Sequence, residues 1–239
     1  MAIRIIRCYA AARTAFLLEQ PADFYHQNRI HMFILAHRGL WHEPDERNQP
    51  EALRFALAQG FGLETDVRDA AGELVIAHDP PTRPAQLLAE VLAHHHALAG
   101  HTPLAINIKA DGLRHQLKLL LDEHAVKNYF CFDMSVPEML AYRREGLCCF
   151  TRQSEYEPHP PLYENAEGVW MDMFEGDWIM PEHVVRHLAA GKRVALVSPE
   201  LHQRPHEGFW TRLRDAGLAG RPGLMLCTDY PESARKFFS

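Results

Sequence analysis

Long apolar runs, paired cysteines and blocks of like charge are all missing from this sequence of 239 residues. No stretch approaches the roughly 20 consecutive apolar residues that a membrane-spanning helix needs, so we predict no membrane span. The five cysteines form no Cys-x-x-Cys spacing, and their odd number argues against a disulfide framework. We therefore expect a reducing compartment, which for this protein means a cytoplasmic location.

The charges exclude one further class of partner. The formal net charge is −6, and both signs are mixed along the chain, so the sequence offers no basic face for nucleic acid. A compact anionic ligand would have to be held by a few local basic side chains. The sequence does not indicate an oligomeric state.

Enough apolar sequence is present for one large domain, because 47% of the residues are hydrophobic. We place this domain at residues 32–239. Residues 1–31 form either an N-terminal arm packed on it or a mis-assigned start, with translation beginning at Met32. A targeting segment is disfavoured because Arg13 interrupts its only candidate apolar core.

Two histidines follow predicted strands near the start of the domain. Residues 33–36 (FILA) form a continuous apolar run, as expected of a strand buried on both faces, and His37 and Arg38 come directly after it. Residues 73–77 form another short strand, which ends at His78. An imidazole can accept or donate a proton near neutral pH, so one of the two can act as a base while the other acts as an acid.

Two acids lie on the predicted strand between these histidines. Glu64 and Asp66 are two residues apart in the strand 63–68, so their carboxylates point to the same side with Cα atoms roughly 6–7 Å apart. Carboxylate oxygens are hard ligands of the kind that Mg²⁺ and Ca²⁺ prefer. The pair therefore indicates a cation site.

The rest of the chain alternates predicted strands with predicted helices. The further strands are 103–109, 128–133, 147–152, 168–175, 192–198 and 223–227, and the helices are 50–59, 84–100, 113–126, 137–145, 181–190 and 209–216. Eight such strands, not counting 73–77 and most of them followed by a helix, favour in one α/β domain a closed (β/α)8 barrel with parallel strands, a TIM barrel. A doubly wound open sheet is less favoured, because no glycine-rich dinucleotide loop follows the first strand.

The run of His94, His95 and His96 falls within the helix predicted over 84–100. Neighbouring residues on a helix point about 100° apart, so the three rings cannot converge on one ion. We expect them on a solvated helix face.

Three short motifs resemble a known family when they are taken in order. His37-Arg38-Gly39, Glu64-Thr65-Asp66-Val67 and His78-Asp79 resemble the signature of the glycerophosphodiester phosphodiesterase family, which has the PLC-like TIM-barrel fold. Asn107-Ile108-Lys109 is similar to the family's Glu-x-Lys, with asparagine in place of a metal-binding glutamate. Residues 228–231 are similar to a Thr-Asp-x-Pro near the family's C-terminus.

This resemblance implies a metal-dependent phosphodiesterase that hydrolyses small glycerophosphodiester-like molecules to an alcohol and a phosphomonoester. The implied roles are acid–base catalysis by His37 and His78, phosphate binding by Arg38 and Lys109, and ligation of Mg²⁺ or Ca²⁺ by Glu64, Asp66 and Asn107. Asp172 and Glu200 follow later strands and are candidates for additional ligands, or alternatively for pocket or ion-pair residues.

There are two alternatives to this function. Asn107 keeps an oxygen ligand but removes one negative charge from the cation site, so a catalytically impaired barrel that binds a phosphate ligand or regulates another protein is one alternative. A phospholipid-directed enzyme, similar to the sphingomyelinase D enzymes, is the other. The sequence itself offers no amphipathic membrane-binding stretch in its support.

Overall fold

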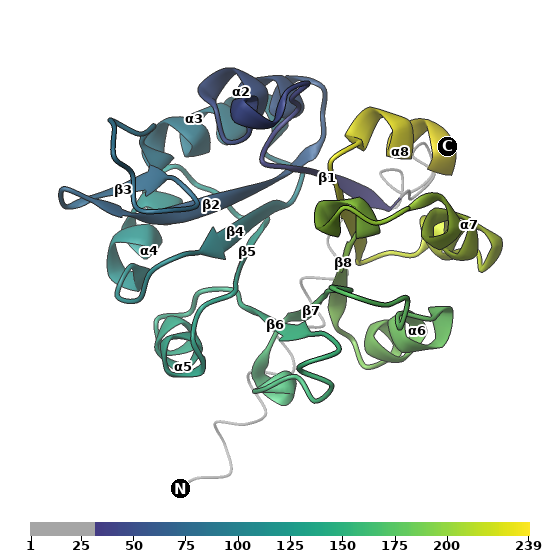
Figure 1. The fold of residues 1–239 in the computed structure, drawn as a ribbon. Coiled ribbons are helices and arrows are strands. Elements are labelled where there is room, and N and C mark those ends of the chain that lie inside the picture. Colours follow the sequence, from purple (N-terminus) through teal and green to yellow (C-terminus); the bar gives the residue numbers. More distant parts are fainter. Residues whose placement is uncertain (1–31) are drawn as a thin grey trace, which may run out of the picture.

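A computed structural model describes residues 32–239 of the chain. The two alternatives for residues 1–31 lie outside the described residues and stay predictions. The described part forms a nearly closed barrel of eight parallel strands surrounded by helices, as Figure 1 shows in a view into the ring of strands. The predicted (β/α)8 barrel is confirmed.

The eight barrel strands follow one another around the ring in the order β5-β4-β2-β1-β9-β8-β7-β6. They are β1 (Phe33–His37), β2 (Gly62–Ala70), β4 (Leu104–Ile108), β5 (Tyr129–Phe132), β6 (Phe150–Gln153), β7 (Gly168–Met171), β8 (Arg193–Val197) and β9 (Leu224–Thr228). Between β5 and β6 the described pairing is a single parallel bridge from Cys131 to Cys149, which brings the two ends of the sheet together.

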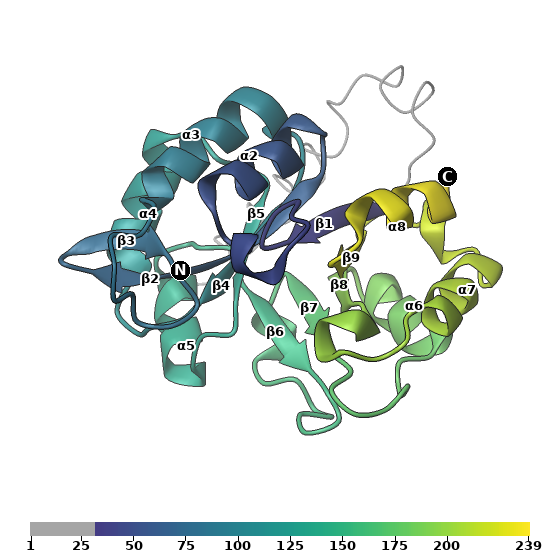
Figure 2. The ribbon, with the colours of Figure 1, turned by 45° about the horizontal axis from the view of Figure 1, so that its top comes forward.

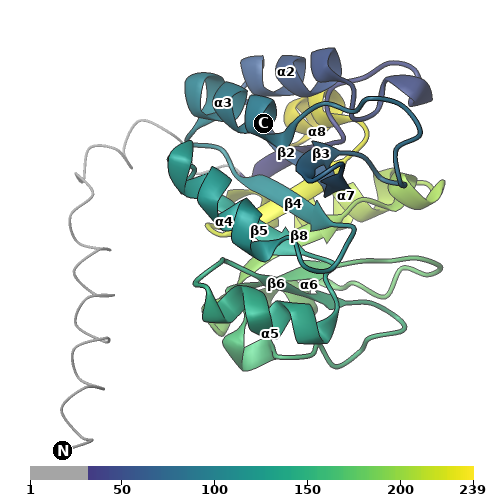
Figure 3. The same ribbon diagram turned by 90° about the vertical axis from the view of Figure 1, so that its left-hand side faces the viewer.

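Helices connect the strands and cover the outside of the barrel (Figure 2). They are α2 (Pro50–Ala58), α3 (Leu88–Ala99), α4 (Arg114–Glu123), α5 (Val136–Arg144), α6 (Pro181–Ala189), α7 (Glu207–Asp215) and α8 (Pro231–Phe238). Proline is the first residue of α2, α6 and α8, where its missing N–H costs no helical hydrogen bond. Figure 3 shows α2 to α5 stacked along one side of the barrel.

One further strand and several short helical turns lie outside the barrel strands and their helices. The strand β3 (Glu73–Ile76) returns antiparallel along β2 as a hairpin outside the ring. Single 3-10 turns lie at η2 (Pro44–Glu46), η3 (Tyr163–Asn165), η4 (Pro199–His202) and η5 (Leu218–Gly220). Among the described residues no helix has the length and apolar character that crossing a bilayer requires.

Two apolar layers result from the alternation of side chains along the strands. The barrel interior is filled largely by aromatic rings, with Phe130 stacked on Phe150 at 3.8 Å and Phe132 on Trp170 at 3.9 Å between ring centroids. The outward-facing strand residues pack against the helices in a second, larger cluster. This packing closes the middle of the barrel and leaves its polar residues at the strand ends.

Two details of the sequence predictions are wrong. His95 is not solvated: its side chain is buried in α3, its Nε2 lies 2.9 Å from the carbonyl oxygen of Thr102, and burial lowers the pKa of the ring. The strand predicted over 168–175 ends at Met171. Beyond it the chain turns away into a loop, in which the Trp178 indole donates a hydrogen bond to the Asp172 carbonyl.

Candidate active site

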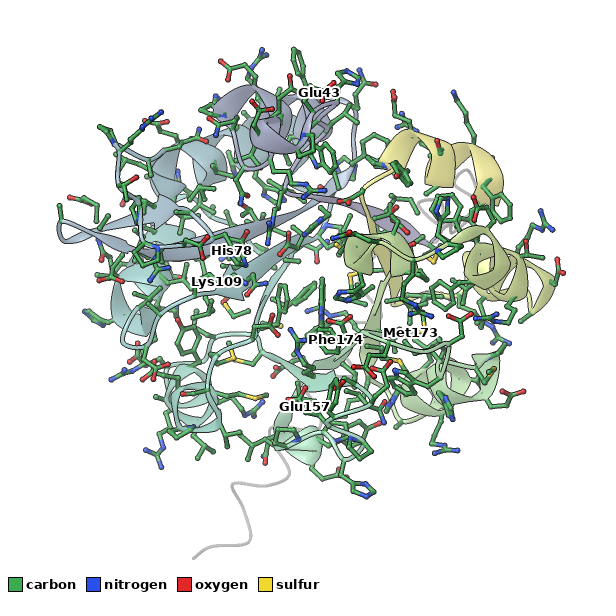
Figure 4. All side chains as sticks on the ribbon, viewed as in Figure 1. Glu43, His78, Lys109, Glu157, Met173 and Phe174 are labelled. Atoms are coloured by element: carbon green, nitrogen blue, oxygen red, sulfur yellow. The ribbon has the colours of Figure 1, made fainter. Side chains whose placement is uncertain are left out.

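The ends of three neighbouring strands bring most of the predicted site residues together. In the parallel register His37 on β1 lies opposite Glu64 on β2, and Asp66 lies opposite Asn107 on β4. Lys109 follows directly after β4. In the view of Figure 4, Lys109 lies on the β2–β4 side of the barrel. Glu64 and Asp66 are alternate residues of one strand, so they share a face, as predicted.

Asp66 is the centre of a charged group that we call the Asp66 cluster: Arg38, Asn48, Asp66 and Lys109. Its buried carboxylate lies 2.8 Å from Arg38 Nε and 3.2 Å from Lys109 Nζ, and it accepts a 2.8 Å hydrogen bond from Asn48 Nδ2. Burial alone would raise the pKa of Asp66, but the two cations and the amide together hold it below its ordinary value. Asp66 is therefore ionised at neutral pH.

Glu64 has a different environment although it lies only two residues away. It is buried, Asn107 Nδ2 lies 3.5 Å from its Oε1, and His37 Nε2 lies 3.9 Å from its Oε2. Burial, followed by the negative charge of Asp66, raises the pKa of Glu64 to about 7. Near neutral pH Glu64 is therefore present in both its neutral and its ionised form.

His37 is held by a carboxylate from the far end of the sequence. Its Nδ1 lies 2.6 Å from Asp229 Oδ1, directly after β9, and Arg47 Nη2 lies 3.2 Å from the other Asp229 oxygen. The guanidinium of Arg47 in turn covers the ring of Trp41, whose indole donates to the His37 carbonyl. Because Asp229 accepts the proton on Nδ1, the free Nε2 faces Glu64 and the mouth of the barrel.

The loop between β1 and α2 has the backbone that this arrangement requires. Arg38 and Asn48 both have positive φ, at 57° and 61°. Between them Gly39 has φ 102°, and a Cβ there would come within 2.9 Å of Ala52, so only glycine fits. Thr65 donates a hydrogen bond to Asn48 Oδ1, which orients the amide toward Asp66. Strained backbone of this kind is common where side chains are held for function.

His78 lies apart from the other predicted residues. It follows the β3 hairpin, its side chain is 48% exposed, and its Nδ1 is 3.1 Å from Asp79 Oδ1. In Figure 4 it lies on the same β2–β4 side of the barrel as Lys109. Within residues 32–239 no hydrogen bond or ion pair joins His78 to His37 or to the Asp66 cluster. Its catalytic role stays a prediction.

Asp172 and Glu200 lie at strand ends as predicted, but their carboxylates are engaged elsewhere. Asp172 is bound by Arg152 Nη1 at 3.0 Å and by His202 Nε2 at 2.6 Å. Glu200 is buried and accepts hydrogen bonds from the hydroxyls of Ser198 and Thr228 and from the Asp229 amide. The contacts of Asp172 with Arg152 and His202 correspond to the ion-pair alternative, in which it is not a metal ligand. Glu200 helps to hold the backbone that presents Asp229.

Three side chains carry oxygens that could bind a cation at the strand ends, and they differ in how far they are already engaged. Glu64 Oε2 and Asn107 Oδ1 are buried and have no hydrogen-bond partner among the described residues, which fits a hard cation that prefers oxygen ligands. The third donor is Asp66, which Arg38 and Lys109 already bind. Over residues 32–239 no group of three His, Cys, Asp or Glu side chains is placed to hold a metal ion.

The sequence predictions missed three residues that the barrel brings to the same end. In the sequence Asp229 belongs to the Thr-Asp-x-Pro resemblance, while Asp133 and Arg152 are the last residues of the strands predicted over 128–133 and 147–152. Asp133 and Asp229 directly follow a barrel strand, and Arg152 is the residue before the last of another. The position of polar residues at strand ends, applied to all eight strands, would have found them.

Comparisons with known proteins give the same fold. No family model matches the sequence, and no curated protein matches it. Among solved structures, a putative glycerophosphodiester phosphodiesterase from Galdieria sulphuraria is similar with a TM-score of 0.69 and 17% identity, over 87% of this chain and 98% of that one. A phosphodiesterase from Oleispira antarctica, in complex with the product sn-glycerol-3-phosphate, has a TM-score of 0.61 and 16% identity, over 87% and 96% of the two chains.

A more distant match is a Ca²⁺-dependent phosphatidylinositol-specific phospholipase C from Streptomyces antibioticus. Its TM-score is 0.53 and its identity 12%, over 88% of this chain and 97% of that one. Similarity at these identities establishes the fold: residues 32–239 share the barrel of these phosphodiesterases. Function has to be argued from the site itself.

Proposed function

We propose that this protein is a phosphodiesterase of the glycerophosphodiester phosphodiesterase type, which cleaves a small phosphodiester to an alcohol and a phosphomonoester. The observation that carries the proposal is the His37–Asp229 pair beside the Asp66 cluster at the strand ends. The structural neighbours support it, because several of them are glycerophosphodiester phosphodiesterases and one contains sn-glycerol-3-phosphate.

Arg38 and Lys109 supply the positive charge for the phosphate. Arg38 binds Asp66 through Nε, which leaves the N–H groups on its two terminal nitrogens to donate to phosphate oxygens. Lys109 adds a compact charge on the other side of Asp66. Both side chains remain partly exposed, at 21% and 19%, so a ligand can reach them. Asp66 fixes the spacing between the two cations.

His37 acts as the base and His78 as the acid. His37 Nε2 takes the proton from the attacking hydroxyl as its oxygen bonds to phosphorus, and Asp229 stabilises the imidazolium that forms. The bond from phosphorus to the leaving alcohol oxygen breaks, and His78 gives that oxygen a proton. The family resemblance implies a neighbouring substrate hydroxyl as the first nucleophile, and water then opens the cyclic phosphate.

Glu64, Asp66 and Asn107 would hold a divalent cation, Mg²⁺ or Ca²⁺. Such an ion supplies charge neutralisation of the phosphate and acidification of the attacking hydroxyl. The raised pKa of Glu64 and the unpartnered oxygens of Glu64 and Asn107 support this assignment, because an ion beside them would compensate the burial of a carboxylate.

A binding protein without catalysis is the second candidate. The observation in its favour is Asn107, whose amide stands where a third carboxylate would complete the site. The phosphate-binding side chains would be kept in such a protein, but the cation would be weakly held. A phospholipid-directed enzyme is a variant of the first candidate, supported by the structural likeness to the phosphatidylinositol-specific phospholipase C.

Product release from a substrate panel tests these candidates. The purified chain is assayed with diesters of glycerol 3-phosphate, a lysophospholipid and an aryl phosphodiester, each with Mg²⁺, Ca²⁺, Mn²⁺ or a chelator. The variants are His37→Ala and Asn107→Glu, and Arg143→Gln is the control because Arg143 pairs with Glu167 in a partly exposed ion pair outside the site.

The proposal predicts metal-dependent turnover that is lost in His37→Ala and kept in Arg143→Gln. Turnover that appears only in Asn107→Glu would favour the binding protein. Turnover of the lysophospholipid alone would favour the phospholipid-directed variant. Equal turnover by the wild type and His37→Ala would contradict the assignment of the base.

A further inference from the structure

A cavity of about 490 Å³ opens beside the candidate active site. Asn107 and Lys109 line one wall, while Asp133, Arg152 and Glu157 line another. The volume lies within the range typical of small-molecule sites. A ligand whose phosphate contacts Lys109 would therefore extend toward the ends of β5 and β6. Of the predicted site residues, Asn107 and Lys109 line the cavity, and none contributes to the second wall.

The second wall is built around Arg152, in a group that we call the Arg152 cluster: Asp133, Arg152, Asp172 and His202. Arg152 donates through Nε to Asp133 Oδ1 at 2.9 Å and through Nη1 to Asp172 Oδ2 at 3.0 Å. His202 Nε2 occupies the other Asp172 oxygen at 2.6 Å. Two carboxylates from different strand ends therefore hold the planar guanidinium in one orientation.

This arrangement leaves both donors and acceptors for a ligand. Arg152 Nη2 also contacts Asp133 Oδ1, at 2.5 Å, so one N–H on each terminal nitrogen of Arg152 is free. Asp133 Oδ2 accepts no hydrogen bond from any described residue. Asp133 has φ 66°, the left-handed region that aspartate tolerates better than most residues. Backbone strain at a strand end beside a cavity is typical of a functional position.

The charges of the cavity discriminate between kinds of ligand. Asp133 and Asp172 compensate Arg152, and Glu157 adds a further carboxylate 3.9 Å from the guanidinium. A second anionic group would face these acids, and a quaternary ammonium would face the guanidinium without being able to accept its hydrogen bonds. An aliphatic hydroxyl both donates and accepts, so it can satisfy Arg152 and Asp133 together.

The remaining surface of the cavity is apolar and suits the carbon skeleton of an alcohol. Met134, Met139 and Pro161 contribute to the lining. The Phe174 ring lies 5.3 Å from the Arg152 guanidinium carbon and 4.8 Å from the His202 ring. In the view of Figure 4 Phe174 projects over the middle of the ring of strands. Its ring covers the guanidinium and limits its contact with water.

We propose that this cavity binds the alcohol half of the phosphodiester and that Arg152 and Asp133 select an uncharged alcohol with several hydroxyl groups. The inference deepens the proposed function and rests on it for the role of the cavity in a reaction. Asp172 and His202 are positioning residues, because they hold Arg152 and do not line the cavity.

Diesters of glycerol 3-phosphate that differ only in the second alcohol test the selection. Inositol and glycerol represent the uncharged polyols, choline and ethanolamine the cations, and 4-nitrophenol an alcohol without aliphatic hydroxyls. The main variant is Asp133→Asn, because asparagine keeps the shape of the side chain and tolerates positive φ. Arg152→Lys removes the fork but keeps the charge, and Arg143→Lys is the matched control at a partly exposed ion pair with Glu167.

The expected result is a kcat/KM at least about tenfold higher for the polyol diesters than for the cationic ones, since unpaired polar groups in a site built for hydroxyls are costly. Asp133→Asn and Arg152→Lys should lower kcat/KM on polyol diesters by about 10- to 100-fold and change the nitrophenyl diester by less than about threefold. Equal or better turnover of the choline diester, or equal losses on all substrates, would overturn the proposal.

Saturation-transfer NMR with free myo-inositol and free choline gives a readout that does not depend on turnover. Contact of inositol with the wild type, lost in Asp133→Asn and kept in Arg143→Lys, supports the cavity assignment even if no diester is cleaved, in which case only the proposed function fails. An inositol signal that is absent or unchanged by Asp133→Asn overturns the inference.

Discussion

The Asp66 cluster and the Arg152 cluster lie at the same end of the barrel, yet the buried acids in the two regions differ in their hydrogen-bond and ion-pair partners. Both clusters pair an aspartate with basic groups from other strand ends. Beside Asp66, however, Glu64 and Asn107 keep buried oxygens without a partner, and the pKa of Glu64 is raised. In the Arg152 cluster both oxygens of Asp172 are bound.

This difference fits the two roles that we propose, a reactive site around Asp66 and a recognition site around Arg152. Unpartnered buried oxygens are costly unless a cation or a ligand compensates them, so they indicate a place where something binds tightly. A carboxylate that is fully bound is stable by itself and fixes the shape of its neighbours. The proposal therefore assigns the chemistry to the first region and the selection of the alcohol to the second.

Of all the variants, removal of the Asp66 carboxylate should change activity and stability most strongly. Asp66→Asn leaves Arg38 and Lys109 without their counter-charge, so we expect activity to fall to background and the free energy of unfolding to fall by about 2–4 kcal/mol. Denaturant unfolding and turnover measure the two effects. The control Asp122→Asn removes an exposed helix ion pair with Lys118 and should cost less than about 0.5 kcal/mol. A similar small cost for both variants would contradict the central role of Asp66.

Loss of the His37 partner is the next largest expected effect. Asp229→Asn keeps the side-chain volume but no longer stabilises an imidazolium or holds the Nδ1–H tautomer, so kcat should fall by about 100- to 1000-fold. Steady-state kinetics across pH 5–9 measure this loss. Asp215→Asn, at an exposed pair with Arg214, should leave kcat unchanged. An unchanged kcat in Asp229→Asn would show that His37 is not the base.

The pH dependence of the free energy of unfolding should identify Glu64 as the acid whose pKa is raised by burial. The pKa of Glu64 is about 7 in the folded protein, above its ordinary value of 4.5, so the folded state binds this proton more tightly than the unfolded state. The stabilisation from the protonated form is complete below pH 4.5 and is lost as pH rises through 7. Glu64→Gln should therefore lose less stability than the wild type between pH 5 and 7.5.

Urea unfolding in chelator-containing buffer measures this difference, which should be on the order of a few kcal/mol. Glu73→Gln, at an exposed position at the start of β3, is the control and should follow the wild type. Parallel pH profiles for wild type and Glu64→Gln would show that the Glu64 environment is no different from that of a surface acid.

The smallest expected effect concerns the cation. Asn107→Glu adds a carboxylate beside Glu64 and should raise the affinity for Ca²⁺ or Mg²⁺ by about tenfold, because hard cations gain from ligand charge. Isothermal calorimetry measures the affinity directly. Asn165→Glu, on the surface turn η3, should leave the affinity unchanged. Equal affinities for the wild type and Asn107→Glu would remove Asn107 from the proposed donor set.

Much of the frame was predictable from local pattern. The alternation of apolar strands with helices predicted the barrel, and alternate positions on one strand predicted that Glu64 and Asp66 share a face. The predicted neighbourhood of these acids with His37 and Lys109 required only that β1, β2 and β4 be adjacent and parallel. Short connections along the chain make such adjacency the usual outcome.

The contacts that depend on distant segments were not predictable in this way. Asp229 reaches His37 because β9 pairs with β1, although 192 residues separate the two side chains. Arg152 reaches Asp133 because the bridge between β5 and β6 closes the ring. His95 was predicted to be solvated, but the pattern of one helix does not show that Thr102 folds back over it.

By itself, the sequence determined the order of the elements, the strand ends at which polar side chains collect, and the chemical types available there. Those properties follow from local backbone preferences and from the periodicity of apolar residues. Only the tertiary structure decided that Asp66 is paired with cations and that Glu64 is buried without one. That choice depends on closure of the barrel, because burial and the distance to a cation, not residue type, set the charge of Glu64 and Asp66.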